Sequence, residues 1–254
     1  AQVSNGPDAF EFAIDFGTTN THVEYRVNNG QVTHPLEMSA SDSAILTMHP
    51  VDRLYEELFV QKDIELFLDA PIQEFMPVAF GAQEMTGLPL RTNICVGKTS
   101  SQEEGQGIRT KITLGDYSIG FHYERKQALP NNRTITNLKW LGDGNQPYVT
   151  SFFEELLMLI RSKVLRNGGS LKKTQITWFY PVSMEPFRLS QLQSEWSQLC
   201  QRLIDEQCPV QRVTESLAPF YYYKNTQGVN AAYRPVVLMD IGGGTTDFAV
   251  YENN

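Results

Sequence analysis

The chain has 254 residues, of which 41% are hydrophobic and 20% are charged, and its formal net charge is −8. This composition is that of a globular protein long enough to bury a substantial core, and it excludes an intrinsically disordered chain. The acidic balance, without a cluster of basic residues, argues against a nucleic-acid partner.

Cysteine usage and the absence of long apolar runs indicate the compartment. Cys95, Cys200 and Cys208 contain no C-x-x-C pair, which favours free thiols in a reducing environment. No run reaches the ~18 apolar residues of a membrane helix, and the polar start at Ala1 to Asp8 does not resemble a signal peptide. We therefore expect a cytoplasmic protein with no membrane partner.

A glycine-containing turn follows the first predicted strand. Phe10 to Phe16 and His22 to Val27 have strand character, and Asp15-Phe16-Gly17-Thr18-Thr19-Asn20 connects them. Asn28-Asn29-Gly30 predicts a second turn, after which Gln31–Thr33 is expected to form a third short strand. The sequence thus predicts an antiparallel unit at the start of the chain.

The next hundred residues, from about His34 to Asn137, are interrupted by turn residues throughout. Within this segment we expect a helix over Val51 to Phe59 and strands between Ile112 and Tyr123. An inserted subdomain over about residues 34–137 is the interpretation that fits this pattern.

A helix is predicted from Ser151 onward. Ser151 and Glu154 match a capping box at its start, and Gly168-Gly169 predicts its end. Its buried face is expected to consist of Phe153, Leu156, Leu157, Ile160 and Val164.

Strands and helices then alternate. Gln175–Tyr180 predicts a strand, Pro186 opens a second helix, and Val210–Val213 predicts another strand, with Thr214 as a cap for a helix beginning near Glu215. The helix after Pro186 carries an apolar stripe at Leu189, Leu192, Trp196, Leu199 and Leu203. This alternation predicts an α/β fold with a mixed sheet.

A second glycine-containing turn lies near the end of the chain. The apolar run Val236–Met239 leads into Asp240-Ile241-Gly242-Gly243-Gly244-Thr245-Thr246-Asp247, and Phe248–Tyr251 follows, which predicts strand, turn and strand. Glycines allow successive amides to converge on an anion, and the flanking acids can hold a cation. A lone turn of this kind is usually structural, but the pair, each with an Asp at the strand end and Thr-Thr after glycine, favours phosphate binding.

These two stretches resemble the phosphate motifs of a known superfamily. Ile14 to Asn20 and Asp240 to Asp247 are similar to those of the actin, sugar-kinase and heat-shock chaperone ATPases, most of all in the DnaK-type chaperone branch. The resemblance implies an actin-like (ribonuclease H-like) fold. Residues 1–234 would form its first lobe, including the inserted subdomain, and residues 235–254 the first hairpin of a second lobe.

The resemblance also implies a site for ATP or ADP with Mg²⁺. Phosphate oxygens would bind the residues of the two turns, namely Gly17, Thr18, Thr19, Gly242, Gly243, Gly244 and Thr245. Asp15, Asp240 and Asp247 would hold the magnesium ion, largely through its water shell.

Catalytic roles follow from the same resemblance. Glu215 corresponds to the glutamate that orients or deprotonates the attacking water, although Ser216 replaces the usual proline; the alternative is an acid at a helix start. Lys139, within Thr136 to Gly142, corresponds to the catalytic lysine, and the alternative is an exposed structural lysine. Asp240 is counted with the catalytic group as well as with the metal ligands.

The function implied is that of an ATP-dependent, DnaK-type chaperone-like protein with a protein client, a second lobe and further domains as partners. An actin-like filament or cell-division scaffold is the alternative, and a non-catalytic nucleotide-binding module is a third. In each case the complete protein would bind nucleotide between two lobes, and this chain alone would bind it weakly.

Overall fold

The structure is a computed structural model that describes residues 6–36, 90–97, 112–114, 132–142, 144–227, 235–244 and 246–252. The helix expected over Val51 to Phe59 lies outside these residues, as does most of the expected insertion. The division into a first lobe, an inserted subdomain and a second-lobe hairpin therefore stays a prediction.

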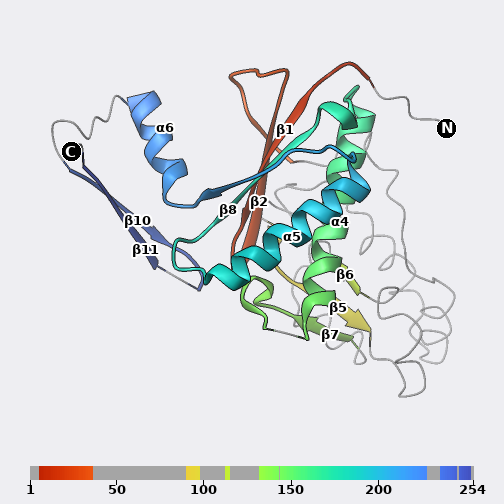
Figure 1. The fold of residues 1–254 in the computed structure, drawn as a ribbon, viewed down its shortest axis with the longest axis horizontal. Helices are drawn as coiled ribbons and strands as arrows, with labels where there is room; N and C mark the ends of the chain where they lie inside the picture. Colours follow the sequence, from red (N-terminus) through yellow and green to blue (C-terminus); the bar gives the residue numbers. More distant parts are fainter. Residues whose placement is uncertain are drawn as a thin grey trace, which may run out of the picture.

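A six-stranded mixed sheet forms the centre of the molecule, with the order β3-β2-β1-β8-β9 and β4 beside β2 (Figure 1). Its strands are β1 (Phe10–Phe16), β2 (Asn20–Val27), β3 (His34–Pro35), β4 (Leu90–Arg91), β8 (Gln175–Tyr180) and β9 (Val210–Thr214). β1 runs antiparallel to β2 and parallel to β8, and β8 runs parallel to β9. The α/β class with a mixed sheet flanked by helices is thus confirmed.

Two helices cover one face of this sheet through an aromatic core. They are α4 (Gln146–Arg166) and α5 (Pro186–Leu203). Phe153 on α4 packs against Phe16 of β1 at 4.9 Å between ring centroids, and against Trp196 of α5 at 3.9 Å. Trp196 in turn lies 6.4 Å from Trp178 of β8. All four rings are fully buried, so the predicted apolar faces of both helices do form the core.

Helix α4 begins five residues before the predicted capping box. Gln146 is its first residue, Pro147 occupies the first turn, and Ser151 is buried inside the helix. The prediction of a cap at Ser151 is wrong because proline, which lacks an amide hydrogen, starts a helix without losing a hydrogen bond. The predicted end is confirmed: Gly168 has a φ of +76° and the Gly169 amide donates to the Val164 carbonyl at 2.8 Å.

The third strand is also displaced from its predicted place. Asn28 and Asn29 take positive φ angles and make the expected turn, but the strand that pairs with β2 is His34–Pro35 instead of Gln31–Thr33. Pairing of Tyr25 with His34 leaves residues 28–33 as the connection, so the loop is longer than the turn alone suggested.

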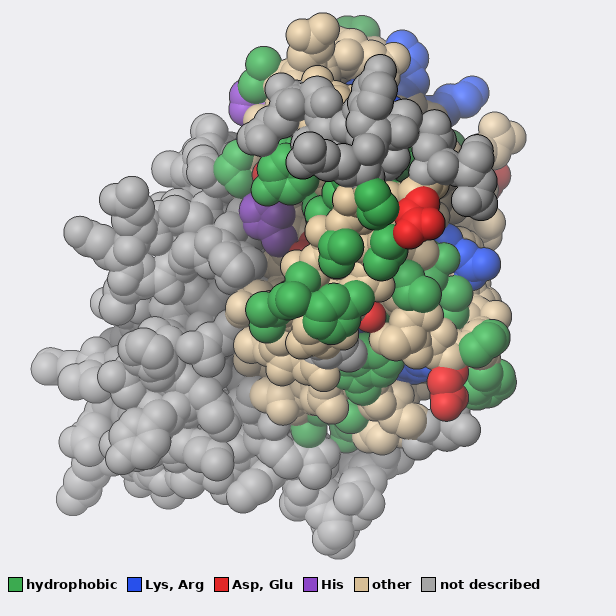
Figure 2. All heavy atoms as spheres, turned by 90° about the vertical axis from the view of Figure 1, so that its left-hand side faces the viewer, with side chains coloured by type: hydrophobic (Ala, Val, Ile, Leu, Met, Phe, Trp, Pro, Cys, Tyr) green, Lys and Arg blue, Asp and Glu red, His purple; other side chains and the backbone are tan. Residues whose placement is uncertain are grey.

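The end of the chain forms a separate hairpin of β10 (Val236–Ile241) and β11 (Thr246–Tyr251), as predicted. It rests against α6 (Leu217–Gln227), where Tyr251 stacks on Phe220 at 4.0 Å and its hydroxyl donates to the Ser216 carbonyl at 2.7 Å. The opposite face is apolar and exposed, with Val237, Met239, Ile241, Phe248 and Val250 each 58–74% exposed. Figure 2 shows hydrophobic side chains gathered on this side of the molecule.

A small three-stranded sheet lies in the region of the expected insertion. It comprises β5 (Ile94–Gly97), β6 (Ile112–Leu114) and β7 (Asn132–Ile135), with β5 in the middle. β6 confirms the start of the strands expected from Ile112. The short helix η4 (Leu138–Trp140) follows β7 and leads the chain back toward the main sheet.

Two of the three cysteines have side chains that the structure describes. Cys200 and Cys208 are free and buried, as expected, and burial together with the neighbouring thiol raises the pKa of Cys200. In the part of the chain that the structure describes, no helix combines the length and the apolar character needed to cross a membrane.

Candidate functional site

The two glycine turns, more than 200 residues apart in the chain, lie against each other. A Cβ atom added at Gly243 would fall 2.0 Å from the Thr19 hydroxyl oxygen, and one at Gly244 would fall 2.8 Å from that of Thr18. Because no real side chain tolerates such distances without displacement, glycine at these positions permits the close approach. Glycine is also needed at position 17, for a reason within the first turn itself: an added Cβ would lie 2.4 Å from the Asn20 carbonyl oxygen.

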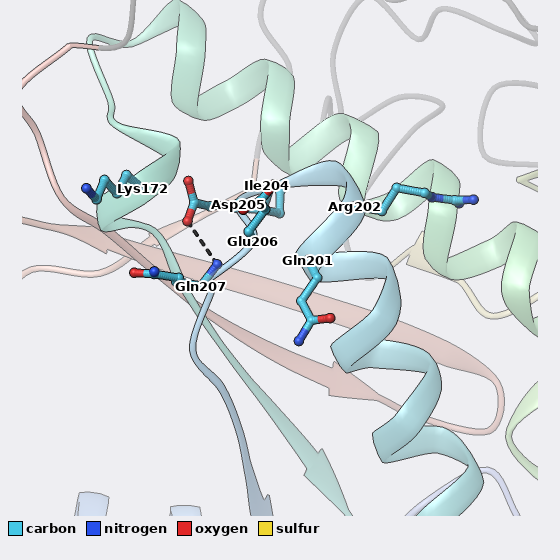
Figure 3. A pocket seen from close by; sticks show the side chains of 7 residues that line it. All are labelled: Lys172, Gln201, Arg202, Ile204, Asp205, Glu206 and Gln207. Atoms are coloured by element: carbon cyan, nitrogen blue, oxygen red, sulfur yellow. Dashed lines mark hydrogen bonds between the residues drawn. The ribbon is translucent and has the colours of Figure 1, made fainter.

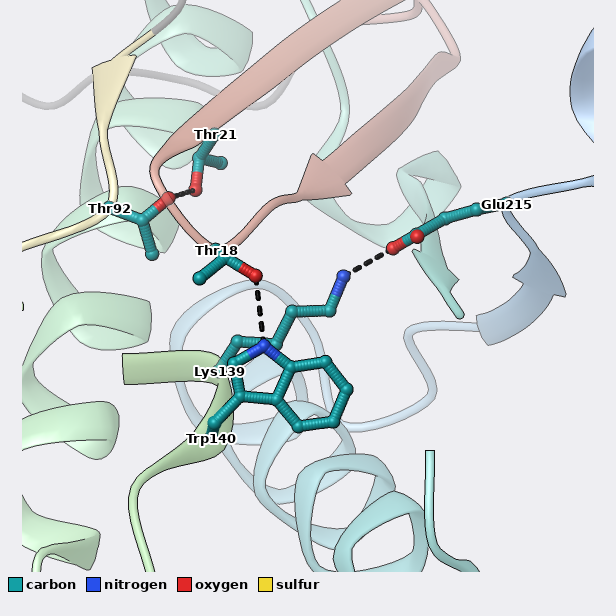
Figure 4. Close-up of polar contacts among 6 residues, drawn as sticks. All are labelled: Thr18, Thr21, Thr92, Lys139, Trp140 and Glu215. Carbon is teal, nitrogen blue, oxygen red and sulfur yellow. Dashed lines mark hydrogen bonds and ion pairs between the residues drawn. The ribbon is translucent and has the colours of Figure 1, made fainter. Parts of the chain in front are cut away.

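Three hydrogen bonds hold the first turn in place, and Figure 4 shows two of them, Trp140 to Thr18 and Thr21 to Thr92. The Trp140 indole donates to the Thr18 hydroxyl at 2.9 Å, and the Thr92 amide donates to the Thr19 carbonyl at 2.8 Å. The hydroxyls of Thr21 and Thr92 are 2.7 Å apart in a buried pair. The turn is thereby fixed by residues from two other parts of the chain.

Lys139 and Glu215 form a buried ion pair beside this turn. The Lys139 ammonium donates to a Glu215 carboxylate oxygen, and the side chains are only 3% and 12% exposed. The alternative of an exposed structural lysine is therefore wrong. Glu215 lies between β9 and α6, its amide donates to the Tyr180 carbonyl at 2.9 Å, and α6 begins two residues later than predicted, at Leu217.

The charges of four predicted site residues influence one another. Burial raises the pKa of Glu215; Lys139 opposes this effect, and the carboxylates of Asp15 and Asp240 add to it. The pKa of Asp15 is raised in the same way, by desolvation first and by Asp240 as well, again against the influence of Lys139. Three acids thus share a single buried lysine.

This arrangement suits a cation only in combination with other ligands. Within the described residues, no group of three or more His, Cys, Asp or Glu side chains is placed to hold a metal ion. Magnesium commonly uses one or two protein carboxylates, with water and phosphate oxygens as its other ligands. Asp15 and Asp240 fit that pattern, whereas Asp247 lies opposite Asp240 in the hairpin register and its role stays a prediction.

The structure places most of the predicted phosphate-binding residues in this region. Thr18 and Thr19 meet Gly244 and Gly243 at the contact between the turns. Gly17 precedes them in the first turn, and Gly242 lies exposed directly after β10. Thr245 lies outside the described residues. Binding of phosphate by these groups remains a prediction.

Sequence reasoning missed two residues of the site. The signal that could have identified Trp140 is its position directly after Lys139 in the sequence. Thr92 lies in a segment without a recognisable motif, and its bond to Thr19 arises only from tertiary packing.

A shallow hollow elsewhere on the molecule has no relation to this site. It lies at the C-terminal end of α5 and is lined by Lys172, Gln201, Arg202, Ile204, Asp205, Glu206 and Gln207 (Figure 3). With its 18 residues α5 is roughly 27 Å long, and its other end lies near the glycine turns. The hollow has both acidic and basic side chains, so it shows no preference for an anion.

No protein-family model and no curated protein matches this chain. Two similar solved structures are MreB5 of Spiroplasma citri bound to ADP, with 11% identity and a TM-score of 0.48, and MreB5 of the same organism bound to AMPPNP, with 13% and 0.46. The matches cover 95% and 96% of this chain, and the chain spans about half the length of each, 48% and 49%.

A likeness of this strength assigns neither a family nor an activity to this chain. The DnaK-type chaperone branch and the actin-like alternative both stay predictions.

Removing either partner of the ion pair should destabilise the protein. We expect Lys139→Met or Glu215→Gln to lower the free energy of unfolding by up to about 3–5 kcal/mol, because a buried polar or charged partner is left alone. The double variant should lose less unfolding free energy than the sum of the losses in the two single variants. Urea unfolding of all four proteins measures this coupling, and strict additivity would show that the pair does not form.

The raised pKa of Glu215 predicts how stability depends on pH. A folded-state pKa above that of the unfolded chain means that the folded protein binds the proton more readily, so stability falls as pH rises from the ordinary carboxyl range through the raised value. Glu215→Gln should flatten this fall, and Glu206→Gln in an exposed loop should not. Urea unfolding midpoints measured between about pH 4 and pH 8 test this prediction. If Glu215→Gln loses stability with rising pH as steeply as the wild type does, the raised pKa of Glu215 is contradicted.

Proposed function

We propose that this chain binds the phosphates of ATP or ADP between its two glycine turns. The observation that supports this most directly is the contact of Gly243 and Gly244 with Thr19 and Thr18 beside the buried Lys139. Two glycine turns offer converging amides, and a nearby cation adds the charge that phosphates require. The same residues explain why side chains are excluded from the turn.

Hydrolysis of ATP is the activity that we assign to the complete protein. Phosphoryl transfer requires a positioned phosphate, neutralised charge and an oriented water. Lys139 supplies positive charge and holds the Glu215 carboxylate in one orientation, while the raised pKa of Glu215 makes it a better proton acceptor than an ordinary carboxylate. A magnesium ion held by Asp15 and Asp240 would supply further charge neutralisation.

The hairpin supports a proposal about partners. Within the described residues, β10 and β11 pair only with each other, and two-stranded sheets are marginally stable in water. Their exposed apolar face suits a second lobe, packed so that the nucleotide lies between the lobes. Location in the cytoplasm, where ATP is available and thiols stay reduced, completes the proposal.

Titration of Mg-ATP into the chain, followed by calorimetry, tests nucleotide binding. Gly243→Ala should weaken binding at least tenfold, about 1.4 kcal/mol, because the added methyl group would occupy space between the turns that the phosphates need. Gly142→Ala is the matched control, since its added Cβ would meet no atom within 4 Å. Equal affinity of the two variants, or no binding by wild type and by a version extended through a second lobe, would contradict the proposal.

A second candidate function is nucleotide-controlled assembly, which the exposed apolar hairpin face favours over a monomeric chaperone. Sedimentation with Mg-ATP, with ADP and without nucleotide distinguishes the two. An assembling protein should pellet with ATP and should stay in the supernatant with ADP or without nucleotide. A protein that stays in the supernatant under all three conditions is not a filament former.

A further inference from the structure

Helix η4, which carries both Lys139 and Trp140, has little hydrogen bonding of its own. It contains three residues, it follows Asn137 with a φ of 62°, and its own backbone bonds are Trp140 to Asn137 at 3.0 Å and Leu141 to Leu138 at 3.4 Å. A single turn of this type does not maintain its position unaided. Its orientation must come from contacts with its surroundings.

Arg188, in the first turn of α5, makes such a contact with the backbone of η4. Its Nη2 donates to the Leu138 carbonyl at 3.0 Å, and its Nε donates to the Lys139 carbonyl at 3.1 Å. The guanidinium is a rigid planar fork, so two bonds to consecutive carbonyls fix both position and orientation. Its remaining nitrogen, Nη1, lies 3.4 Å from the Gln191 side-chain oxygen, on the same helix.

The helix that presents Arg188 is firmly anchored. Leu192 and Trp196 of α5 are fully buried, and Trp196 stacks on Phe153 of α4. Contacts from α5 therefore transmit the position of the core to η4. From η4, Lys139 extends to Glu215 and Trp140 extends to Thr18, so both side chains depend on one short backbone segment.

We propose that Arg188 is a positioning residue for the nucleotide site: by binding the carbonyls of Leu138 and Lys139 it orients Lys139 toward Glu215 and Trp140 toward the first glycine turn. This inference rests on the proposed function for its catalytic consequence, and its structural part is independent of it. Arg188 itself touches neither glycine turn through any bond described above. Its effect is exerted through η4.

The first test needs no nucleotide. In ¹H–¹⁵N spectra, the indole signal of Trp140, assigned by its loss in Trp140→Phe, reports the bond to Thr18. Arg188→Gln should shift this signal and speed its hydrogen exchange, while the indole signals of the buried Trp178 and Trp196 stay in place. Gln191→Ala is the matched control: it removes the neighbour of Nη1 and leaves in place the two bonds from Nε and Nη2 to the carbonyls of η4, so it should shift none of the three.

The second test measures ATP hydrolysis by the complete protein. Arg188→Gln should lower kcat by about tenfold or more, within the 100-fold that a displacement of about 1 Å can cause, and should change KM less. Arg188→Lys should recover part of the rate, because an ammonium can reach one carbonyl where the guanidinium binds two. Should Arg188→Gln lack a cooperative thermal transition, Arg188→Lys carries both tests.

The two tests separate the two claims. An unshifted Trp140 signal in both Arg188 variants overturns the positioning role, whether or not ATP binds. A shifted signal in a protein that neither binds nor hydrolyses ATP supports the hold of Arg188 on η4 and overturns the proposed function. Equal losses of kcat in Arg188→Gln and Gln191→Ala would also overturn the positioning role, since that role rests on the bonds from Arg188 to the carbonyls of η4.

Discussion

The ion pair between Lys139 and Glu215 is the constraint on which the candidate site depends. A lysine that is almost completely buried must have a partner, because an isolated charge in the interior is costly. The partner comes from the connection between β9 and α6, so the pair joins the segment after the small sheet to the edge of the main sheet. Asp15 and Asp240 then add negative charge around the same cation. The structure concentrates acidic charge where the sequence places its glycine turns.

The elements that follow from periodicity were predictable, and those that depend on distant packing were not. Alternating residues identified β1 and β8, and the stripe that includes Leu192 and Trp196 identified α5, because local pattern and burial agree there. The start of α4 was misplaced because two helix-start signals compete, and Pro147 prevails over Ser151. The local sequence pattern does not show which of two competing start signals begins the helix.

The candidate site likewise combines residues that local sequence identifies with contacts that only the fold reveals. Its glycine turns could be recognised because their chemistry is written in consecutive residues. The Trp140 bond to Thr18 joins residues 122 positions apart, and the Arg188 bonds use the carbonyls of η4, which any residue type provides. A bond to a backbone carbonyl cannot be predicted from the type of the residue that provides the carbonyl. Lys139 and Glu215 were identified by resemblance, while their pairing required the fold.

The direct contact between the glycine turns has a mechanical consequence. Any group that enters between them must push one turn away from the other. The first turn is continuous with the six-stranded sheet and is tied down by Trp140 and Thr92, whereas the hairpin is fastened to α6 through Tyr251. We therefore expect any displacement to fall on the hairpin and to be passed to α6, which begins only two residues after Glu215.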